Sequence, residues 1–291
     1  MIFDKTVNLI RYFFKNSRLQ QSKLFLNIYD IYARRLNMHN INKKIVAINF
    51  QGIDLLINTD NRGIEPTIIS GSWERKEIRL FKEKIINCDS LIDVGANVGL
   101  YSLLGLKANP SLKNLIAIEP HPETYQILKQ NLSIHSISNV KLRTINKGAS
   151  ELSGFAELTN YDIPAATRLK NFSINGSNYN KVEVINLDSL IAIFAQNSKL
   201  FIKIDVEGLE PSIICGGQKL ITKFHPKILF ELSSENLKLS NDSIENAAKV
   251  LELNYKIVTI ITPRKTIRSR EVTQTLMSFA SKRGIFSVYF E

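Results

Sequence analysis

The sequence at residues 91–102 reads Leu-Ile-Asp-Val-Gly-Ala-Asn-Val-Gly-Leu-Tyr-Ser. Its first four residues are mostly apolar, which is typical of a strand buried on both faces of a parallel sheet. Gly95 lets the backbone turn without a Cβ, and Gly99 allows close approach to the start of a helix. Apolar residues then recur at helical spacing, at Leu100, Leu103, Leu104 and Leu106. A strand, a tight glycine turn and a helix make up half of a nucleotide-binding βαβ unit.

The second half of the unit is predicted at residues 114–118, Asn-Leu-Ile-Ala-Ile, which have the pattern of the next buried strand. Glu119 and Pro120 follow directly. A carboxylate at the tip of the second strand binds a ribose diol, because it accepts hydrogen bonds from both hydroxyls. The sequence therefore predicts a nucleoside-binding fold with Glu119 at the ribose.

The spacing of the glycines indicates which nucleoside is bound. The dinucleotide pattern Gly-x-Gly-x-x-Gly, which a pyrophosphate requires, is absent. S-adenosylmethionine has no phosphate but carries an amino-acid end, which suits an acidic residue and an amide at the turn. We therefore predict S-adenosylmethionine as the cofactor. Its methionine end and backbone are assigned to Asp93, Gly95, Asn97 and Gly99.

These two stretches resemble the first two motifs of the class I S-adenosylmethionine-dependent methyltransferases. Asp93–Gly99 looks like the first motif, and Ile118-Glu119-Pro120 looks like the second. Further apolar runs follow along the chain, up to a closing strand at residues 285–290. Together they predict a Rossmann-like α/β fold: a seven-stranded, mostly parallel, doubly wound sheet with an N-terminal helical extension.

A second informative stretch covers residues 200–208, Leu-Phe-Ile-Lys-Ile-Asp-Val-Glu-Gly. We predict a buried strand that ends in two carboxylates, and alternation along an extended chain would place Asp205 and Glu207 on the same side. The next strand is predicted at residues 226–230, ending at Glu231. Carboxyl ends of strands line the ligand crevice of an open α/β sheet, so these acids should face the nucleoside. The alternative is a structural ion pair with Lys203 or Lys219.

Residues 151–180 interrupt the alternation of strands and helices. Residues 151–159 are predicted to pair with residues 181–185 as an antiparallel excursion. The connection, residues 160–180, is a polar loop rich in Asn, Ser and Gly. Long loops inside a compact domain are commonly functional, so we interpret this segment as the substrate region.

The net charge of +11 is concentrated near the N-terminus, where residues 1–44 hold nine Lys or Arg against two Asp. Residues 1–43 are predicted to be a basic amphipathic helical extension, and residues 44–291 the methyltransferase domain. One interpretation is that the helices cap the core or a second subunit, which would make a homodimer. The other is that residues 1–40 lie on an anionic membrane surface.

Cysteine usage bears on the compartment. Two cysteines, Cys88 and Cys215, are too few for a disulfide framework, and both lie in apolar surroundings, which favours packing roles in a reduced compartment. No long apolar run indicates a signal peptide or a transmembrane span. We therefore expect a cytoplasmic protein, with contact at the inner face of the membrane as a further option.

The two informative stretches, with Leu187-Asp188-Ser189-Leu190 between them, resemble the FkbM-type methyltransferase family from about Gly71 to Glu231. The more discriminating signature is residues 202–210, Ile-Lys-Ile-Asp-Val-Glu-Gly-Leu-Glu, in which Leu209 stands where a small residue is common. The resemblance implies O-methylation of a sugar hydroxyl in a surface glycan or of a secondary-metabolite hydroxyl.

Roles at the reacting centre follow from position. A neutral hydroxyl is a poor nucleophile, so a positioned base should take its proton. Asp205 is placed near the cofactor amine or the reacting methyl group. Glu207 is our first choice for the general base and Glu231 our second. A divalent ion held by these three acids is an alternative, but no histidine accompanies them, so no metal site is predicted.

Three other functions compete with this prediction. A basic chain could be a nucleic-acid methyltransferase, but the Asn/Asp-Pro-Pro-aromatic motif of amino-methylating DNA enzymes is missing, since no Pro-Pro dipeptide occurs. A non-catalytic scaffold that retained the fold is disfavoured by the acids at every predicted strand tip. An oxidoreductase that uses a nicotinamide dinucleotide lacks its glycine pattern.

Overall fold

The computed structural model describes residues 45–58, 74–135, 139–159, 168–171 and 181–291, in two compact units, residues 1–75 and 76–291. In the first unit, β1 (Ile45–Phe50) and β2 (Ile53–Asn58) form an antiparallel hairpin. Its turn residues Gln51 and Gly52 both have positive φ, as a two-residue type I′ hairpin turn requires. The predicted extension over residues 1–43 lies outside the described residues.

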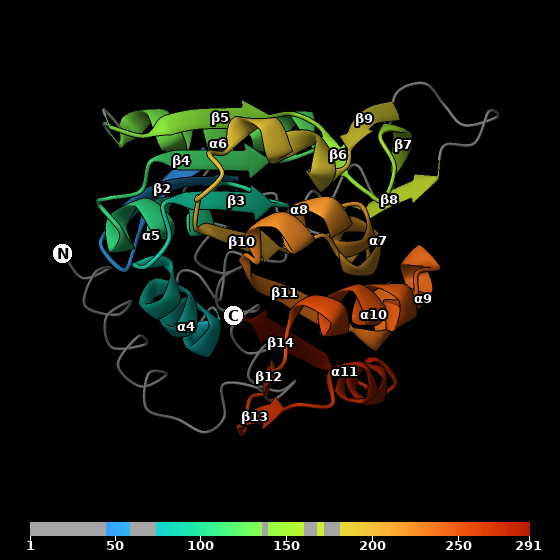
Figure 1. Ribbon diagram of the computed structural model, residues 1–291. Coiled ribbons are helices and arrows are strands. Elements are labelled where there is room, and N and C mark those ends of the chain that lie inside the picture. The colour runs from blue at the N-terminus through green and yellow to red at the C-terminus, as the bar shows by residue number, and fades with distance from the viewer. Residues whose placement is uncertain (1–44, 59–73, 136–138, 160–167, 172–180) are drawn as a thin grey trace, which may run out of the picture. The chain divides into compact units, whose positions relative to one another are not determined.

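The second unit is built on an eight-stranded sheet in the order β13-β12-β14-β11-β10-β3-β4-β5 (Figure 1). Five neighbouring strands, β11 to β5 in that order, are parallel, and β14 enters antiparallel between β11 and β12. The predicted mostly parallel sheet is confirmed, with one strand more than the seven expected: β13 forms a short hairpin with β12 at the edge. The strands are β3 (Ser90–Val94), β4 (Asn114–Ile118), β5 (Lys141–Ile145), β10 (Leu200–Ile204), β11 (Lys227–Ser233), β12 (Val258–Ile261), β13 (Thr266–Ser269) and β14 (Ile285–Phe290).

Helices cover both faces of this sheet. On one face, alternate strand residues such as Ile92 and Ile202 share an apolar cluster with residues of α7, α8 and α10. On the other face, Phe81 of α4 packs edge-on against Phe201 of β10 and Tyr101 of α5, with ring centroids 5.0 and 5.1 Å away. The sheet is therefore doubly wound. The helices are α4 (Arg75–Ile85), α5 (Leu100–Ala108), α6 (Pro122–Ile134), the 3₁₀ helix η3 (Leu187–Ile193), α7 (Glu210–Cys215), α8 (Gln218–Phe224), α9 (Ser234–Ser240), α10 (Ile244–Asn254) and α11 (Val272–Ala280).

The strand order reverses between β3 and β10. From β3 the chain proceeds to β4 and β5, whereas from β10 it proceeds to β11 on the other side. Ligands of open α/β sheets bind outside the carboxyl ends of the strands at such a reversal. Backbone bonds tie the tips together here: Gly95 N donates to Ile118 O (3.0 Å), and Asp205 N donates to Val94 O (3.0 Å).

A second sheet, in the order β6-β9-β7-β8, follows β5. Its strands are β6 (Gly148–Ala149), β7 (Gly154–Thr159), β8 (Arg168–Asn171) and β9 (Lys181–Ile185). The predicted antiparallel pairing of residues 151–159 with 181–185 is confirmed, since β7 pairs with β9. The prediction of an unbroken loop over residues 160–180 is wrong, because β8 adds to the open edge of β7. The rest of that loop lies outside the described residues.

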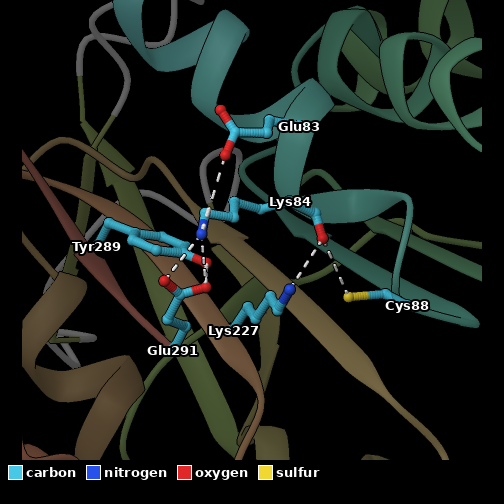
Figure 2. A network of polar contacts seen from close by, with 6 residues as sticks. All are labelled: Glu83, Lys84, Cys88, Lys227, Tyr289 and Glu291. Carbon is cyan, nitrogen blue, oxygen red and sulfur yellow. Dashed lines mark hydrogen bonds and ion pairs between the residues drawn. The ribbon is translucent and has the colours of Figure 1, made fainter.

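A polar network lies where α4 ends and β11 begins (Figure 2). Lys84 Nζ donates to both carboxylate oxygens of Glu291 (2.8 Å each), and Lys227 Nζ donates to Lys84 O (3.2 Å). Tyr289 OH also donates to Glu291 (2.9 Å). Burial alone would raise the pKa of Glu291, but the hydrogen bonds from Lys84 and Tyr289 bring it below its usual value. Lys84 thus links α4 to the sheet.

We expect Lys84→Met to lower the free energy of unfolding by about 1 kcal/mol at pH 7, a value for a pair that solvent still screens. Because the folded-state pKa of Glu291 is lowered, its contribution is present above the unfolded pKa and is lost as the pH falls through the folded value. Urea unfolding at pH 7 and pH 3 should therefore show a gap that closes in acid. Lys249→Met, which removes an exposed pair with Glu245, is the control and should change stability less.

Both cysteines are free thiols, and Cys88 is buried. Burial raises the pKa of Cys88 and of Cys215 to about 11, which fits the predicted packing roles. Within the described ranges, no helix has both the length and the apolar character needed to span a bilayer.

Candidate functional site

The turn between β3 and α5 depends on left-handed backbone conformations. Gly95, Asn97 and Gly99 have φ of +73°, +50° and +91°. A Cβ on Gly95 would lie 1.9 Å from the carbonyl oxygen of Asp205, so the turn packs directly on the residue that follows β10. The predicted glycine turn therefore forms at the reversal of the strand order, beside the first of the predicted catalytic acids.

Glu119 follows β4 and bonds to the same turn. Its Oε2 accepts from Asn97 N (2.9 Å), and its Oε1 accepts from His121 N (2.9 Å). The side chain is buried, and this burial raises the pKa of Glu119 to about 7, although both backbone bonds favour the charged form. Each carboxylate oxygen retains a second lone pair, so Glu119 can still accept from the two hydroxyls of a ribose.

Asn97 provides an acceptor that has no partner. Its Oδ1 is buried and is the only buried side-chain nitrogen or oxygen, within the described part of the chain, without a hydrogen bond. Such an atom costs free energy unless a ligand or water bonds to it. It lies on the residue whose N–H bonds to Glu119. An acceptor here suits a ligand that carries hydroxyl or ammonium donors, as S-adenosylmethionine does.

Asp93 stands at the end of β3 and contacts α5. Ser102 Oγ donates to its Oδ2 (2.6 Å). Burial raises the pKa of Asp93 to about 6, while the bond from Ser102 and the charge of Lys203 act in the opposite direction. Asp93 therefore fixes the start of α5 against β3, and its assignment to the cofactor stays a prediction.

The acids after β10 are arranged differently from the sequence-based expectation. The strand ends at Ile204 and Glu207 has φ of +59°, so the premise of an extended chain through Glu207 is wrong. Asp205 forms an ion pair with Lys203 (Nζ–Oδ2 3.2 Å), the structural alternative that the sequence left open. The Lys203 ammonium is buried and also lies 4.8 Å from the centroid of the Tyr101 ring.

Glu231 lies inside β11 rather than at its end. The predicted strand stopped at residue 230, but β11 continues to Ser233 because β14 pairs with it, placing Glu231 opposite Ser287. Burial raises the pKa of Glu231 well above its usual value, and the charges of Asp205, Glu207 and Glu210 raise it further. These four carboxylates thus form one electrostatic group.

Glu207 is held by α9. Asn236 Nδ2 donates to its Oε2 (2.8 Å), and Ser240 Oγ donates to its carbonyl oxygen (3.2 Å). No group of three or more His, Cys, Asp or Glu side chains in the described ranges is arranged to hold a metal ion. The alternative of a divalent ion on Asp205, Glu207 and Glu231 therefore gains no support.

Two supporting residues make contacts that sequence reasoning did not find, because their partners are remote in the chain. Asn146 Nδ2 donates to Glu119 O (2.9 Å) from beyond α6, and Leu209 packs against the cluster of Ala156, Leu158 and Val184 in the second sheet. That packing explains a leucine where the motif commonly has a small residue. Leu209 stands inside the stretch at residues 202–210, but nothing local in the sequence indicates the partner of either residue.

Comparison with known proteins gives a family match. The model of the methyltransferase FkbM domain matches residues 93–257, more than half of the chain. Methyltransferase sdnD of Sordaria araneosa is 37% identical over 70 residues, which are 24% of this chain and 26% of that protein. The match thus spans about a quarter of the length of that curated relative.

The similar solved structures are more distant in sequence. The methyltransferase FkbM from Methylobacillus flagellatus KT is 17% identical with a TM-score of 0.45, over 78% of this chain and 54% of that one. An S-adenosylmethionine-dependent methyltransferase from Agrobacterium tumefaciens is 8% identical with a TM-score of 0.48, over 87% and 72% of the two chains.

Proposed function

Because the chain belongs to the FkbM methyltransferase family, we propose that it transfers a methyl group to a hydroxyl of a sugar in a surface glycan or of a secondary metabolite. Family membership confirms the predicted class, an S-adenosylmethionine-dependent methyltransferase. The nature of the acceptor and the attack by oxygen are the parts that we propose.

The observation that supports cofactor binding at this edge is the pairing of Glu119 with the glycine turn. A buried carboxylate and the unpartnered Oδ1 of Asn97 lie together where the strand order reverses. Glu119 would hold the ribose hydroxyls, and Asn97 would accept from the amino-acid end. When bound, S-adenosylmethionine supplies an electrophilic methyl group on its sulfonium.

As the general base we propose Glu231 ahead of Glu207, which is the reverse of the order that we derived from the sequence. One carboxylate oxygen of Glu207 already accepts a hydrogen bond from Asn236, which ties this side chain to α9. Burial and three neighbouring acids raise the pKa of Glu231 well above its usual value, so its carboxylate takes up a proton more readily than an ordinary glutamate. We propose that the proton of the acceptor hydroxyl passes to the Glu231 carboxylate as the oxygen forms its bond to the methyl group and the bond from the methyl group to the sulfonium sulfur breaks. Asp205, in an ion pair with Lys203, lies beside the glycine turn.

Glu231→Gln should lower the rate of methyl transfer by about 100-fold or more, whereas Glu207→Gln should lower it less, since general-base catalysis contributes roughly 10²–10⁴-fold. The assay is radiolabelled methyl transfer from S-adenosylmethionine to a panel of glycans and hydroxylated metabolites. Glu235→Gln, an exposed carboxylate in α9, is the control. Wild-type protein that binds the cofactor but methylates no hydroxyl in the panel would contradict the proposed reaction.

We propose a cytoplasmic protein, on the basis of its two free cysteines. Contact of residues 1–40 with an anionic membrane surface and a homodimer through the same helices stay predictions, as these residues lie outside the described ranges.

A further inference from the structure

The turn at residues 205–208 carries two of the proposed site acids, yet it has little regular structure of its own. It follows β10 and precedes α7, and both Glu207 and Gly208 have positive φ, at +59° and +111°. Positive φ is costly for a residue with a side chain, so the surrounding contacts must hold Glu207 in place. Three elements do so.

The first two elements are β3 and α9. Asp205 N donates to Val94 O (3.0 Å), and a Cβ on Gly208 would lie 2.4 Å from the carbonyl oxygen of Asn236. Ser240 Oγ donates to the carbonyl of Glu207 (3.2 Å). These contacts fix the two ends of the turn and one of its sides.

The third element is the first turn of α7, through Glu210. Its carboxylate Oε1 accepts from both Val206 N (3.1 Å) and Gly208 N (3.3 Å). The side chain is only 3% exposed, so water cannot readily replace it. Glu210 thus holds the backbone at Val206 and Gly208, and each of these residues directly follows one of the two acids, Asp205 and Glu207.

We propose that Glu210 is a positioning residue that shapes the 205–208 turn and so sets where Asp205 and Glu207 point. This inference rests on the proposed function, because the orientation of Asp205 and Glu207 affects catalysis only if the cofactor and the acceptor bind at the carboxyl ends of the strands. Glu210 itself touches neither the proposed ribose contact nor Glu231 through a hydrogen bond in the described structure; it acts through the backbone of Val206 and Gly208.

The charge of Glu210 is coupled to the same acids. Burial raises its pKa to about 7, the backbone donors oppose this, and the charge of Asp205 adds to the increase. Because the pKa of Glu210 is higher in the folded than in the unfolded protein, its contribution to stability is fully present below the unfolded-state pKa of about 4.5. This contribution is lost as the pH rises through the folded-state pKa of about 7. The turn therefore gains a further negative charge near neutral pH.

The test compares Glu210→Gln, which keeps an acceptor oxygen, with Glu210→Ala, which removes it. Amide hydrogen exchange should show Val206 and Gly208 protected in wild type and in Glu210→Gln, and exchanging at least 10-fold faster in Glu210→Ala. Affinity for S-adenosylmethionine, measured by calorimetry from pH 6 to 8, should fall about 10-fold in Glu210→Ala. Glu210→Gln should restore most of it and flatten its pH dependence.

Glu245→Gln is the matched control, because Glu245 is an exposed glutamate in the first turn of α10. It should change neither exchange nor affinity. Unchanged exchange at Val206 and Gly208 in Glu210→Ala would overturn the proposal, as would full affinity in the folded variant. If Glu210→Ala does not fold, Glu210→Asp takes its place: its shorter side chain withdraws the acceptor from both N–H groups, and unchanged protection of Val206 and Gly208 in this variant would overturn the proposal. None of these readouts needs an acceptor, so failure of methyl transfer alone would count against the proposed reaction and not against Glu210.

Discussion

Glu119→Ala is expected to weaken binding of S-adenosylmethionine on the order of 100-fold. Hydrogen bonds to a charged acceptor contribute about 1.5–3 kcal/mol each, and the variant loses those that the carboxylate would make to the ribose. It also leaves Asn97 N and His121 N without their acceptor, which loosens the glycine turn. Calorimetric titration of S-adenosylmethionine into wild type and variant measures both the affinity and the enthalpy.

Two further variants separate the ribose contact from general damage. Glu119→Gln retains an acceptor for one backbone N–H, so its fold should be closer to wild type while its affinity stays low. Glu123→Ala changes an exposed glutamate in the first turn of α6 and should bind normally. Equal affinity of Glu119→Ala and wild type would contradict the assignment of this carboxylate to the ribose.

The sequence predicted those parts of the site that depend on short-range signals. A glycine turn after a buried strand and an acid after the next strand are local patterns, and the structure brings Gly95 and Glu119 to the same edge. The parallel core of the sheet could be predicted for the same reason, because runs of apolar residues bounded by turns identify buried strands.

The remaining parts of the site depend on partners that are distant in the sequence. Glu231 was placed one residue past its strand because nothing local indicates that β14 returns to pair with β11. Glu207 was expected on an extended chain, but Asn236 and Ser240, about thirty residues away, hold it in a turn. Side chains alternate between the two faces of a sheet only within a strand, and β10 ends at Ile204, just before Asp205 and Glu207.

The stretch at residues 202–210 also contains Glu210, whose role the sequence pattern does not indicate. Glu210 has the pattern of a solvated first-turn carboxylate, which the helix N-terminus would favour. The structure buries it and directs it back onto the preceding turn. A local pattern thus predicted the residues of the candidate site, whereas the contacts that shape these residues depend on the packing of α7 and α9 around β10.

The largest stability effect is expected for Gly95→Ala, with a loss of about 3 kcal/mol or more in the free energy of unfolding. Two penalties combine: a side chain at φ +73° costs roughly 1–2 kcal/mol, and overpacking costs roughly 1–3 kcal/mol. The added Cβ would lie 1.9 Å from the Asp205 carbonyl oxygen, and a backbone atom cannot move aside as a flexible side chain would.

Gly154→Ala is the matched control, because a Cβ there meets nothing within 4 Å. It should leave stability unchanged or raise it by a few tenths of a kcal/mol, since alanine reduces the freedom of the unfolded chain. Urea unfolding of both variants, with and without S-adenosylmethionine, measures the difference. If Gly95→Ala folds as stably as wild type, the turn does not need its close approach to Asp205. If it folds less stably but binds the cofactor at full affinity, the contact between β3 and β10 supports the sheet and not the cofactor site.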